Sequence, residues 1–217
     1  MKLVWSPEMA SKAYIDTVKS CELSQESGVA ELISAMAAGW DAKFIVETWS
    51  QGGVITTSIG LSIASRHTCG RHMCVVPDER SRSEYVEAMG RAGMSPEVVV
   101  GEPEEVMGGL SGIDFLVVDC RRKDFAKVLR LAKLSHRGAV MVCKNASSRT
   151  ASNFRWRIVL DRGLRLVRSV FLPVGKGLDI AHVGTGGGGS SSSSVTHERR
   201  WVKHVDQHSG EEHVIRK

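Results

Sequence analysis

Polar side chains stand where several apolar runs of this sequence end. Glu47 closes the run that begins at Phe44, Asp119 closes IDFLVVD, and Lys144 and Asn145 close GAVMVCKN. Runs of this kind are typical of buried strands in a parallel sheet, and the carboxyl ends of such strands meet at one edge. A carboxylate, an ammonium and an amide gathered there can hold a small molecule by charge and hydrogen bonds. The sequence therefore predicts a ligand pocket at that edge.

The stretch from Lys43 to Ser65, KFIVETWSQGGVITTSIGLSIAS, positions the first of these side chains. Its strand-like part stops at Glu47, turns through Gly52 and Gly53, and restarts with helical periodicity. A strand followed by a tight turn and a helix directs free backbone N–H groups of the helix start toward the pocket edge. We expect this turn to form one wall of the pocket.

The remaining elements follow from the same periodicities. Two amphipathic helices, near residues 6–21 and 27–40, precede the first strand. Strand-like runs at 44–47, 72–76, 97–101, 113–119 and 138–145 alternate with helical stretches, and 164–184 reads as two strands joined at Pro173–Gly177. We predict an α/β fold with a doubly wound, mostly parallel seven-stranded sheet and a closing antiparallel hairpin.

Composition favours one domain with an appendage. The chain has 217 residues, of which 42% are hydrophobic, and a net charge of +5. We expect an α/β domain over residues 1–184, a Gly/Ser linker over 185–194, and a tail over 195–217 that can form a hairpin. The tail holds four of the eight histidines, but its strand-like pattern favours solvated positions, and we predict no metal there.

Cysteine usage and hydropathy indicate the compartment. The five cysteines form no CxxC pair, and no apolar run approaches the length that spans a bilayer. We expect reduced thiols, no membrane partner, and a cytoplasmic location, with the nucleus as the alternative.

Five segments together carry a resemblance to a known family: FIVETWSQGG, CGRHMCVVPDERSRSEYVEAMGRAGM, FLVVDCRRKDF, RGAVMVCKNA and FLPVGKGLDIAHV. From about Ser6 to Gly184 the chain resembles class I S-adenosylmethionine-dependent methyltransferases, and among them the catechol and caffeoyl-coenzyme A O-methyltransferases. The resemblance implies a Rossmann-like fold, S-adenosylmethionine as cofactor and a small-molecule acceptor. The whole chain also resembles a plant family known as a domain of unknown function.

The resemblance places Glu47, Trp49, Gly52 and Gly53 at the cofactor turn. There Glu47 and Gly53 match the family pattern, whereas Trp49 stands where the first glycine lets the backbone approach the cofactor. Two interpretations stay open: Trp49 shapes a structural turn, or it belongs to an altered ligand site.

A second departure lies after the second strand, where the family carries an acid for the ribose hydroxyls. Val76 occupies that position, and Asp78 lies two residues further on. Asp78 either contacts the ribose or caps the following helix, and capping is favoured. Both departures predict that S-adenosylmethionine binds weakly or not at all.

The acceptor side of the resemblance involves Asp119, Lys144 and Asn145. Divalent-metal members of the family hold their ion with an Asp after the fourth strand and an Asp-Asn pair after the fifth, and here Lys144 replaces the middle ligand. We therefore predict no metal. Lys144 either turns inward and pairs with Asp119, which is favoured, or points to solvent.

Two classes of function remain open. In the first, the chain is a methyltransferase-like protein with weak or no catalysis, or an active metal-independent O-methyltransferase. In the second, it is a binding or regulatory protein that engages an acidic partner or RNA through the arginine-rich segment from Arg149 to Arg168. A solvated outer helix is the favoured interpretation of that segment.

Overall fold

The computed structural model describes residues 5–21, 28–148, 154–161 and 163–185, together with the backbone of two strands at 201–205 and 212–216. The chain divides into two compact units, residues 1–186 and residues 187–217, which are described separately. The candidate pocket lies in the first unit.

The first unit alternates helices and strands. Its helices are α1 (Pro7–Ser20), α2 (Val29–Gly39), α3 (Thr56–His67), α4 (Glu79–Arg91), α5 (Pro103–Gly109), α6 (Phe125–Leu131) and α7 (Trp156–Val159). Its strands are β1 (Phe44–Thr48), β2 (Arg71–Val76), β3 (Glu97–Val100), β4 (Ser111–Ile113), β5 (Phe115–Asp119), β6 (Lys133–Leu134), β7 (Ala139–Lys144), β8 (Leu164–Leu172) and β9 (Leu178–Thr185).

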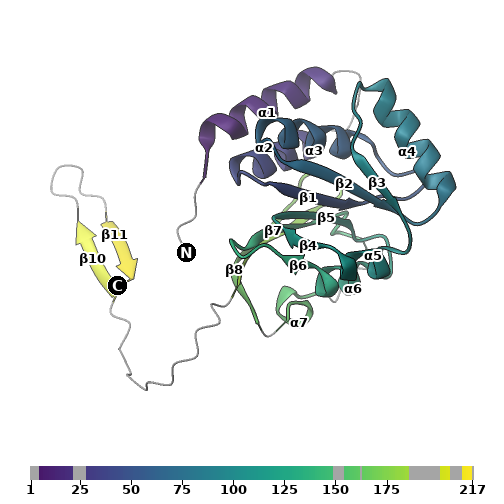
Figure 1. The fold of residues 1–217 in the computed structure, drawn as a ribbon. Helices are drawn as coiled ribbons and strands as arrows, with labels where there is room; N and C mark the ends of the chain where they lie inside the picture. The colour runs from purple at the N-terminus through teal and green to yellow at the C-terminus, as the bar shows by residue number, and fades with distance from the viewer. Residues whose placement is uncertain are drawn as a thin grey trace. The chain divides into compact units, whose positions relative to one another are not determined.

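Seven of these strands form one sheet in the order β3-β2-β1-β5-β7-β9-β8 (Figure 1). Neighbours from β3 to β7 are parallel, whereas β9 runs antiparallel to both β7 and β8. The order reverses beside β1, and in open α/β sheets ligands bind outside the carboxyl ends of strands at such a point. The predicted doubly wound sheet with a closing antiparallel hairpin is confirmed.

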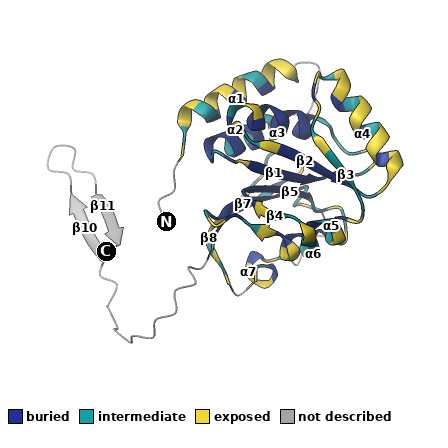
Figure 2. Cartoon of the chain, viewed as in Figure 1, coloured by how far each residue is buried: buried dark blue, intermediate teal, exposed yellow. Residues whose placement is uncertain are grey.

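Helices cover both faces of the sheet. Helices α1 to α4 pack on one face through a core that includes Ile33, Leu61 and Tyr85, and α5 to α7 pack on the other through Phe125 and Trp156. Strands β1, β2, β5 and β7 and helix α3 are the most deeply buried elements, and α1 and α4 turn exposed faces outward (Figure 2). Burial on both faces explains why the parallel strands read as continuous apolar runs.

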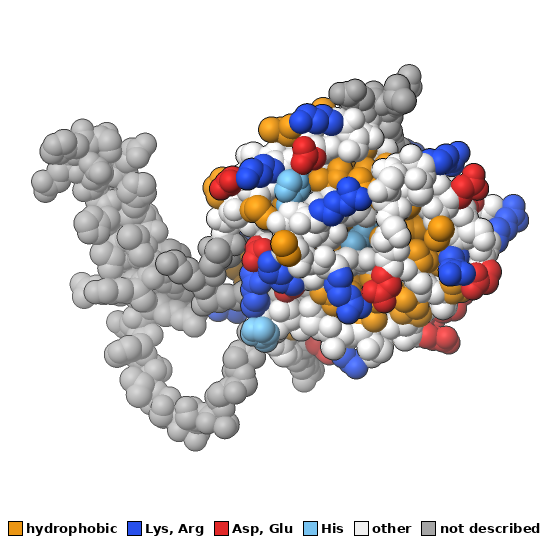
Figure 3. All heavy atoms as spheres, turned by 45° about the horizontal axis from the view of Figure 1, so that its top comes forward, with side chains coloured by type: hydrophobic (Ala, Val, Ile, Leu, Met, Phe, Trp, Pro, Cys, Tyr) orange, Lys and Arg blue, Asp and Glu red, His pale blue; other side chains and the backbone are white. Residues whose placement is uncertain are grey.

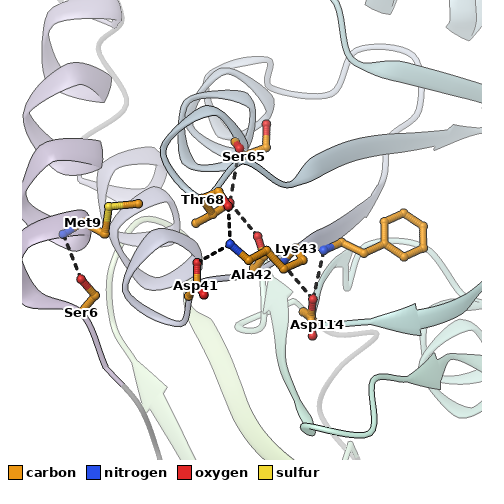
Figure 4. A network of polar contacts seen from close by, with 9 residues as sticks. Ser6, Met9, Asp41, Ala42, Lys43, Ser65, Thr68 and Asp114 are labelled. Atoms are coloured by element: carbon orange, nitrogen blue, oxygen red, sulfur yellow. Dashed lines mark hydrogen bonds and ion pairs between the residues drawn. The ribbon is translucent and has the colours of Figure 1, made fainter.

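A network of backbone and side-chain hydrogen bonds fixes the start of β1 (Figure 4). Asp114 Oδ2 accepts hydrogen bonds from the backbone N–H groups of Lys43 (2.9 Å) and Phe44 (3.1 Å). Thr68 Oγ1, just after α3, donates to Ala42 O at 2.7 Å. These bonds tie β1 to its neighbours at the amino edge, so that the strand delivers Glu47 to the opposite edge in a fixed register.

Two segments differ from the sequence-based prediction. The expected strand 113–119 is interrupted at Asp114, so that β4 pairs with β6 in a separate two-stranded sheet while β5 joins the main sheet. Within the described residues, the outer helix expected in the arginine-rich segment, over residues 152–163, is the four-residue α7, because Arg155 and Leu160 on either side adopt extended backbone angles. Trp156 in α7 is held by a 2.7 Å hydrogen bond from its Nε1 to Asp179 Oδ1.

The second unit contains β10 (Trp201–Val205) and β11 (Glu212–Arg216), which pair antiparallel. In the described parts of the chain, no helix is both long and apolar enough to cross a membrane.

Candidate functional site

A cavity of about 330 Å³ opens at the carboxyl ends of β5 and β7. It is bounded by the start of α2, the start of α3, the two strand ends and the turn between β8 and β9. Its lining residues are Val29, Val54, Thr57, Asp119, Arg121, Lys144, Asn145 and Val174 to Leu178. This volume lies at the small end of the range for small-molecule pockets.

Arg121 binds Asp119 at the end of β5 with two-point geometry. Arg121 Nε lies 3.1 and 3.0 Å from the two carboxylate oxygens, Nη2 lies 2.6 Å from Oδ2, and the backbone N–H of Arg121 donates to Oδ1 at 2.9 Å. Burial raises the pKa of Asp119, but the bonds from Arg121, the side chain of Asn145 and the charge of Lys144 together hold it below its ordinary value. Asp119 is therefore an ionised carboxylate that is already paired.

Lys144 ends β7 directly beside Asp119 in the sheet register. Its side chain turns inward and lines the cavity, and the residue is 8% exposed. It makes no direct hydrogen bond or ion pair with any residue in the described ranges. The Lys144–Asp119 ion pair that the sequence suggested is replaced by the Arg121–Asp119 pair, since a bidentate guanidinium two residues away matches the carboxylate better than an ammonium.

Glu47 lies in β1, is fully buried and does not line the cavity. Its Oε1 accepts a hydrogen bond from Tyr85 Oη at 2.8 Å and lies 3.1 Å from His72 Nε2, whose other ring nitrogen lies 2.8 Å from Ser62 Oγ. Burial raises the pKa of Glu47, but the hydrogen bond and charge of His72, together with the charge of Lys144, bring it below its ordinary value. A buried charged network thus joins β1, β2, α3 and α4.

Trp49 fills the turn between β1 and α3. The residue is 4% exposed, and its ring meets that of Tyr85 edge-on, with centroids 5.4 Å apart. The ring also lies against Gly53, where an added Cβ would come 2.7 Å from Trp49 Nε1. Gly52 is exposed with φ of 71°, and its N–H donates to Glu84 at 3.2 Å.

Asp78 caps helix α4. Its Oδ1 accepts a 2.7 Å hydrogen bond from the backbone N–H of Ser81, and its pKa is lowered by that bond. Val76, at the position of the expected ribose acid, is fully buried in the core.

The structure therefore separates the predicted site residues into two groups. Asp119, Lys144 and Asn145 lie together on the cavity wall, whereas the residues assigned to the cofactor turn, Glu47, Trp49, Gly52, Gly53 and Asp78, do not line it. Sequence reasoning missed Arg121, Lys176 and the β8–β9 turn. The basic residues that follow Asp119 and the glycines of VGKG were the available signals.

Two further features concern metals and the arginine-rich segment. Within the described residues, no group of three or more His, Cys, Asp or Glu side chains could hold a metal ion. Arg155, Arg157, Arg165 and Arg168 are exposed, while Arg149 and Arg162 fall outside the described residues. Basic and acidic side chains are interspersed on the face shown in Figure 3.

Comparison with solved structures places the fold among methyltransferases. A methyltransferase from Geobacter sulfurreducens is 19% identical with a TM-score of 0.58, and the match covers 82% of this chain and 90% of that one. The O-methyltransferase TomG from Streptomyces achromogenes, in complex with SAM, is 22% identical with a TM-score of 0.55, covering 84% and 92%. An O-methyltransferase from Bacillus cereus, in complex with SAH, is 16% identical with a TM-score of 0.56, covering 83% and 93%.

These likenesses establish the class I methyltransferase-like fold, which the sequence motifs predicted. A search of curated protein sequences gave no match. A family profile, however, matches residues 1–217, and the chain therefore belongs to the family described as "Protein of unknown function (DUF1442)".

Proposed function

We propose that this protein is a methyltransferase-like small-molecule-binding protein in which the S-adenosylmethionine site is degenerate, so that methyl transfer is weak or absent. The observation that carries the proposal is the buried indole of Trp49, which lies against Gly53 where the cofactor's methionine part would approach the backbone. The residues of this turn do not fit that cofactor in its ordinary position.

Two other positions support the same proposal. Val76 offers an apolar side chain where a carboxylate would receive the ribose hydroxyls, and the carboxylate of Asp78 already caps α4. Each missing hydrogen bond weakens binding, and losses of about 1 kcal/mol each add up to one or more decades in affinity.

Calorimetric titration of the full-length protein with S-adenosylmethionine tests the proposal. We expect a Kd weaker than about 100 μM. A low-micromolar Kd would overturn it and favour an enzyme.

The alternative, an active metal-independent small-molecule O-methyltransferase, has one observation in its favour. Three polar atoms near the β1–α3 turn, Glu47 Oε2, Trp49 Nε1 and Ser58 Oγ, are buried and have no hydrogen-bond partner among the described residues. Buried polar atoms are usually paired, and a cofactor that displaced the indole could pair them. Asp119, Lys144 and Asn145 would then border the acceptor. Transfer of a labelled methyl group to a catechol in metal-free buffer would establish this alternative.

An acidic or RNA partner is a separate proposal, supported by the exposure of Arg155, Arg157, Arg165 and Arg168. Binding of this kind falls steeply with salt, because phosphate contacts release counterions. A titration with single-stranded RNA at low and high salt tests it, and the absence of binding at low salt would remove it.

A further inference from the structure

The cavity at the ends of β5 and β7 carries a surplus of positive charge. Arg121, Lys144 and Lys176 line it, and Asp119 is the acidic residue in the lining. Helix α3 adds to this surplus, because Val54 and Thr57 bring its N-terminus to the wall and no side chain caps it. The N-terminus of a helix carries partial positive charge and unpaired backbone N–H groups.

Lys144 is the buried charged residue of this lining that makes no direct hydrogen bond or ion pair within the described residues. It is 8% exposed, lines the cavity and has no direct partner in the described part of the chain. The nearest carboxylate in the sheet register, that of Asp119, is already engaged by Arg121 through both oxygens. The ammonium interacts with the charges of the Glu47 and Asp119 carboxylates and borders the cavity, where an anion would supply the direct hydrogen bonds that these carboxylates do not.

The turn from Val174 to Gly177, which carries Lys176, is fixed in place over the cavity. The N–H groups of Ala146 and Ser147 donate to the carbonyl oxygens of Gly177 and Lys176 at 3.0 and 3.1 Å. Gly175, with φ of 59°, lies so close to α2 that an added Cβ would come 2.6 Å from Val29 Cγ2. These contacts hold the turn in position, so that Lys176 lines the same cavity as Lys144.

We propose that this cavity binds a small molecule through a phosphate group, with Lys144 as the principal ligand and Lys176 and Arg121 beside it. A phosphate monoester carries about −1.5 to −2 charge near neutral pH, which matches the charge surplus of the lining better than the single charge of a carboxylate does. The inference rests on the proposed function, because a chain that binds S-adenosylmethionine in the ordinary way would use this edge for cofactor and acceptor.

Inorganic phosphate is the probe. The full-length protein is titrated with sodium phosphate, sodium acetate and sodium chloride at equal ionic strength, and the thermal midpoint and the heat of binding are recorded. We expect a saturable rise in the midpoint with phosphate, in proportion to site occupancy, and a smaller rise or none with acetate. A rise that does not saturate, or one that acetate reproduces, would overturn the proposal.

Variants separate specific binding from the general stabilising effect of phosphate on folded proteins. Lys144→Met keeps the length of the side chain and removes its charge, and we expect it to weaken phosphate binding about tenfold or more. Lys133→Met, at an exposed lysine of β6 that does not line the cavity, should bind phosphate as the parent does. If Lys144→Met binds phosphate like the parent, the proposal is wrong.

A second variant covers the case in which Lys144→Met fails to fold. Lys176 is exposed, so Lys176→Met should fold normally and weaken phosphate binding several-fold. Unchanged affinity in that variant would likewise contradict the proposal. The S-adenosylmethionine titration on the same sample keeps the two proposals apart: tight cofactor binding would refute the proposed function, whereas weak cofactor binding without saturable phosphate binding would refute the phosphate site alone.

Discussion

The carboxyl edge of the sheet has two halves, one filled by side chains that contact one another and one that contains a cavity. In the closed half, around β1 and β2, Glu47, Trp49, His72 and Tyr85 are buried and contact one another. In the open half, around β5 and β7, a cavity remains and the buried ammonium of Lys144 faces it without a direct partner in the described ranges.

The two halves differ in how their charged side chains are paired. In the closed half, Tyr85 and His72 both contact Oε1 of the buried Glu47 carboxylate, so that charge is held by neighbouring side chains rather than by a ligand. In the open half, Arg121 pairs with Asp119, and Lys144 makes no direct hydrogen bond or ion pair within the described ranges. Variants in the first half should therefore change stability, and variants in the second should change binding.

The largest effect is expected for Trp49→Ala. Removing a buried indole that packs on Tyr85 leaves a cavity in the core, which costs about 3–5 kcal/mol of unfolding free energy. Urea denaturation measures the loss. Ile158→Ala is the control, because Ile158 is 70% exposed and its truncation should stay within about 0.5 kcal/mol. A loss below about 1 kcal/mol for Trp49→Ala would mean that the turn is not part of the core.

Tyr85→Phe should have the next largest effect. The substitution keeps the ring and removes the 2.8 Å hydrogen bond to the buried carboxylate of Glu47. Loss of a hydrogen bond to a charged group costs about 1.5–3 kcal/mol. Tyr14→Phe, at a residue that is 46% exposed, should be nearly silent in the same urea experiment. Equal effects of the two variants would show that the Glu47 network contributes nothing to stability.

The closed half also illustrates what the sequence could predict. Apolar runs identified the strands of the sheet to within a few residues, because burial on both faces leaves little choice of residue type. Asp78 as a helix cap was equally readable, since an acid before a polar helix start has a specific local role. Both patterns involve residues that are close together in the chain, so they can be recognised in a single sequence.

The partners of Glu47 and Asp119 were not readable. His72 and Glu47 are 25 residues apart in the chain and lie on neighbouring strands, so their contact depends on the sheet register. A clue was present, because both are polar residues inside otherwise apolar strands. The presence of Arg121 two residues after Asp119 was evident from the sequence, but their ion pair depends on how the chain turns after β5. The interruption of the strand at Asp114 was also not predicted. The Asp114 side chain accepts hydrogen bonds from backbone N–H groups at the start of β1, and such a long-range contact leaves no local pattern in the sequence.

Lowering the pH should reduce the unfolding free energy through protonation of Glu47, by less than the Trp49 and Tyr85 variants do. The pKa of Glu47 in the folded protein lies below its ordinary value of 4.5, mainly because His72 offsets the effect of burial. A depressed folded-state pKa gives stabilisation that is complete above the unfolded-state pKa and is lost as pH falls through the folded-state pKa. The unfolding free energy should therefore fall below about pH 4.5, and Glu47→Gln should flatten that fall. Parallel pH curves for the two proteins would contradict this assignment.

The smallest effect is expected in the open half, where magnesium binding to a Lys144 variant is measured. The parent protein should show no magnesium-dependent change in thermal midpoint, because the Lys144 ammonium and the Arg121 guanidinium both oppose a cation in this cavity. Lys144→Asp creates an oxygen set of two carboxylates and the Asn145 amide, which suits magnesium or manganese. At ten times the Kd, binding to this variant should add about 1.4 kcal/mol to its unfolding free energy.

A further substitution at Arg121 should increase the response to magnesium. Its guanidinium bonds to both oxygens of Asp119, so a metal must compete with it in the single variant. Arg121→Gln combined with Lys144→Asp frees the carboxylate, and the double variant should bind magnesium more tightly and raise the midpoint further. Lys133→Asp, which adds a carboxylate outside the cavity, serves as the matched control and should not respond to the metal. If the parent bound magnesium as well as the variants do, the cationic character of the open half would not govern what binds there.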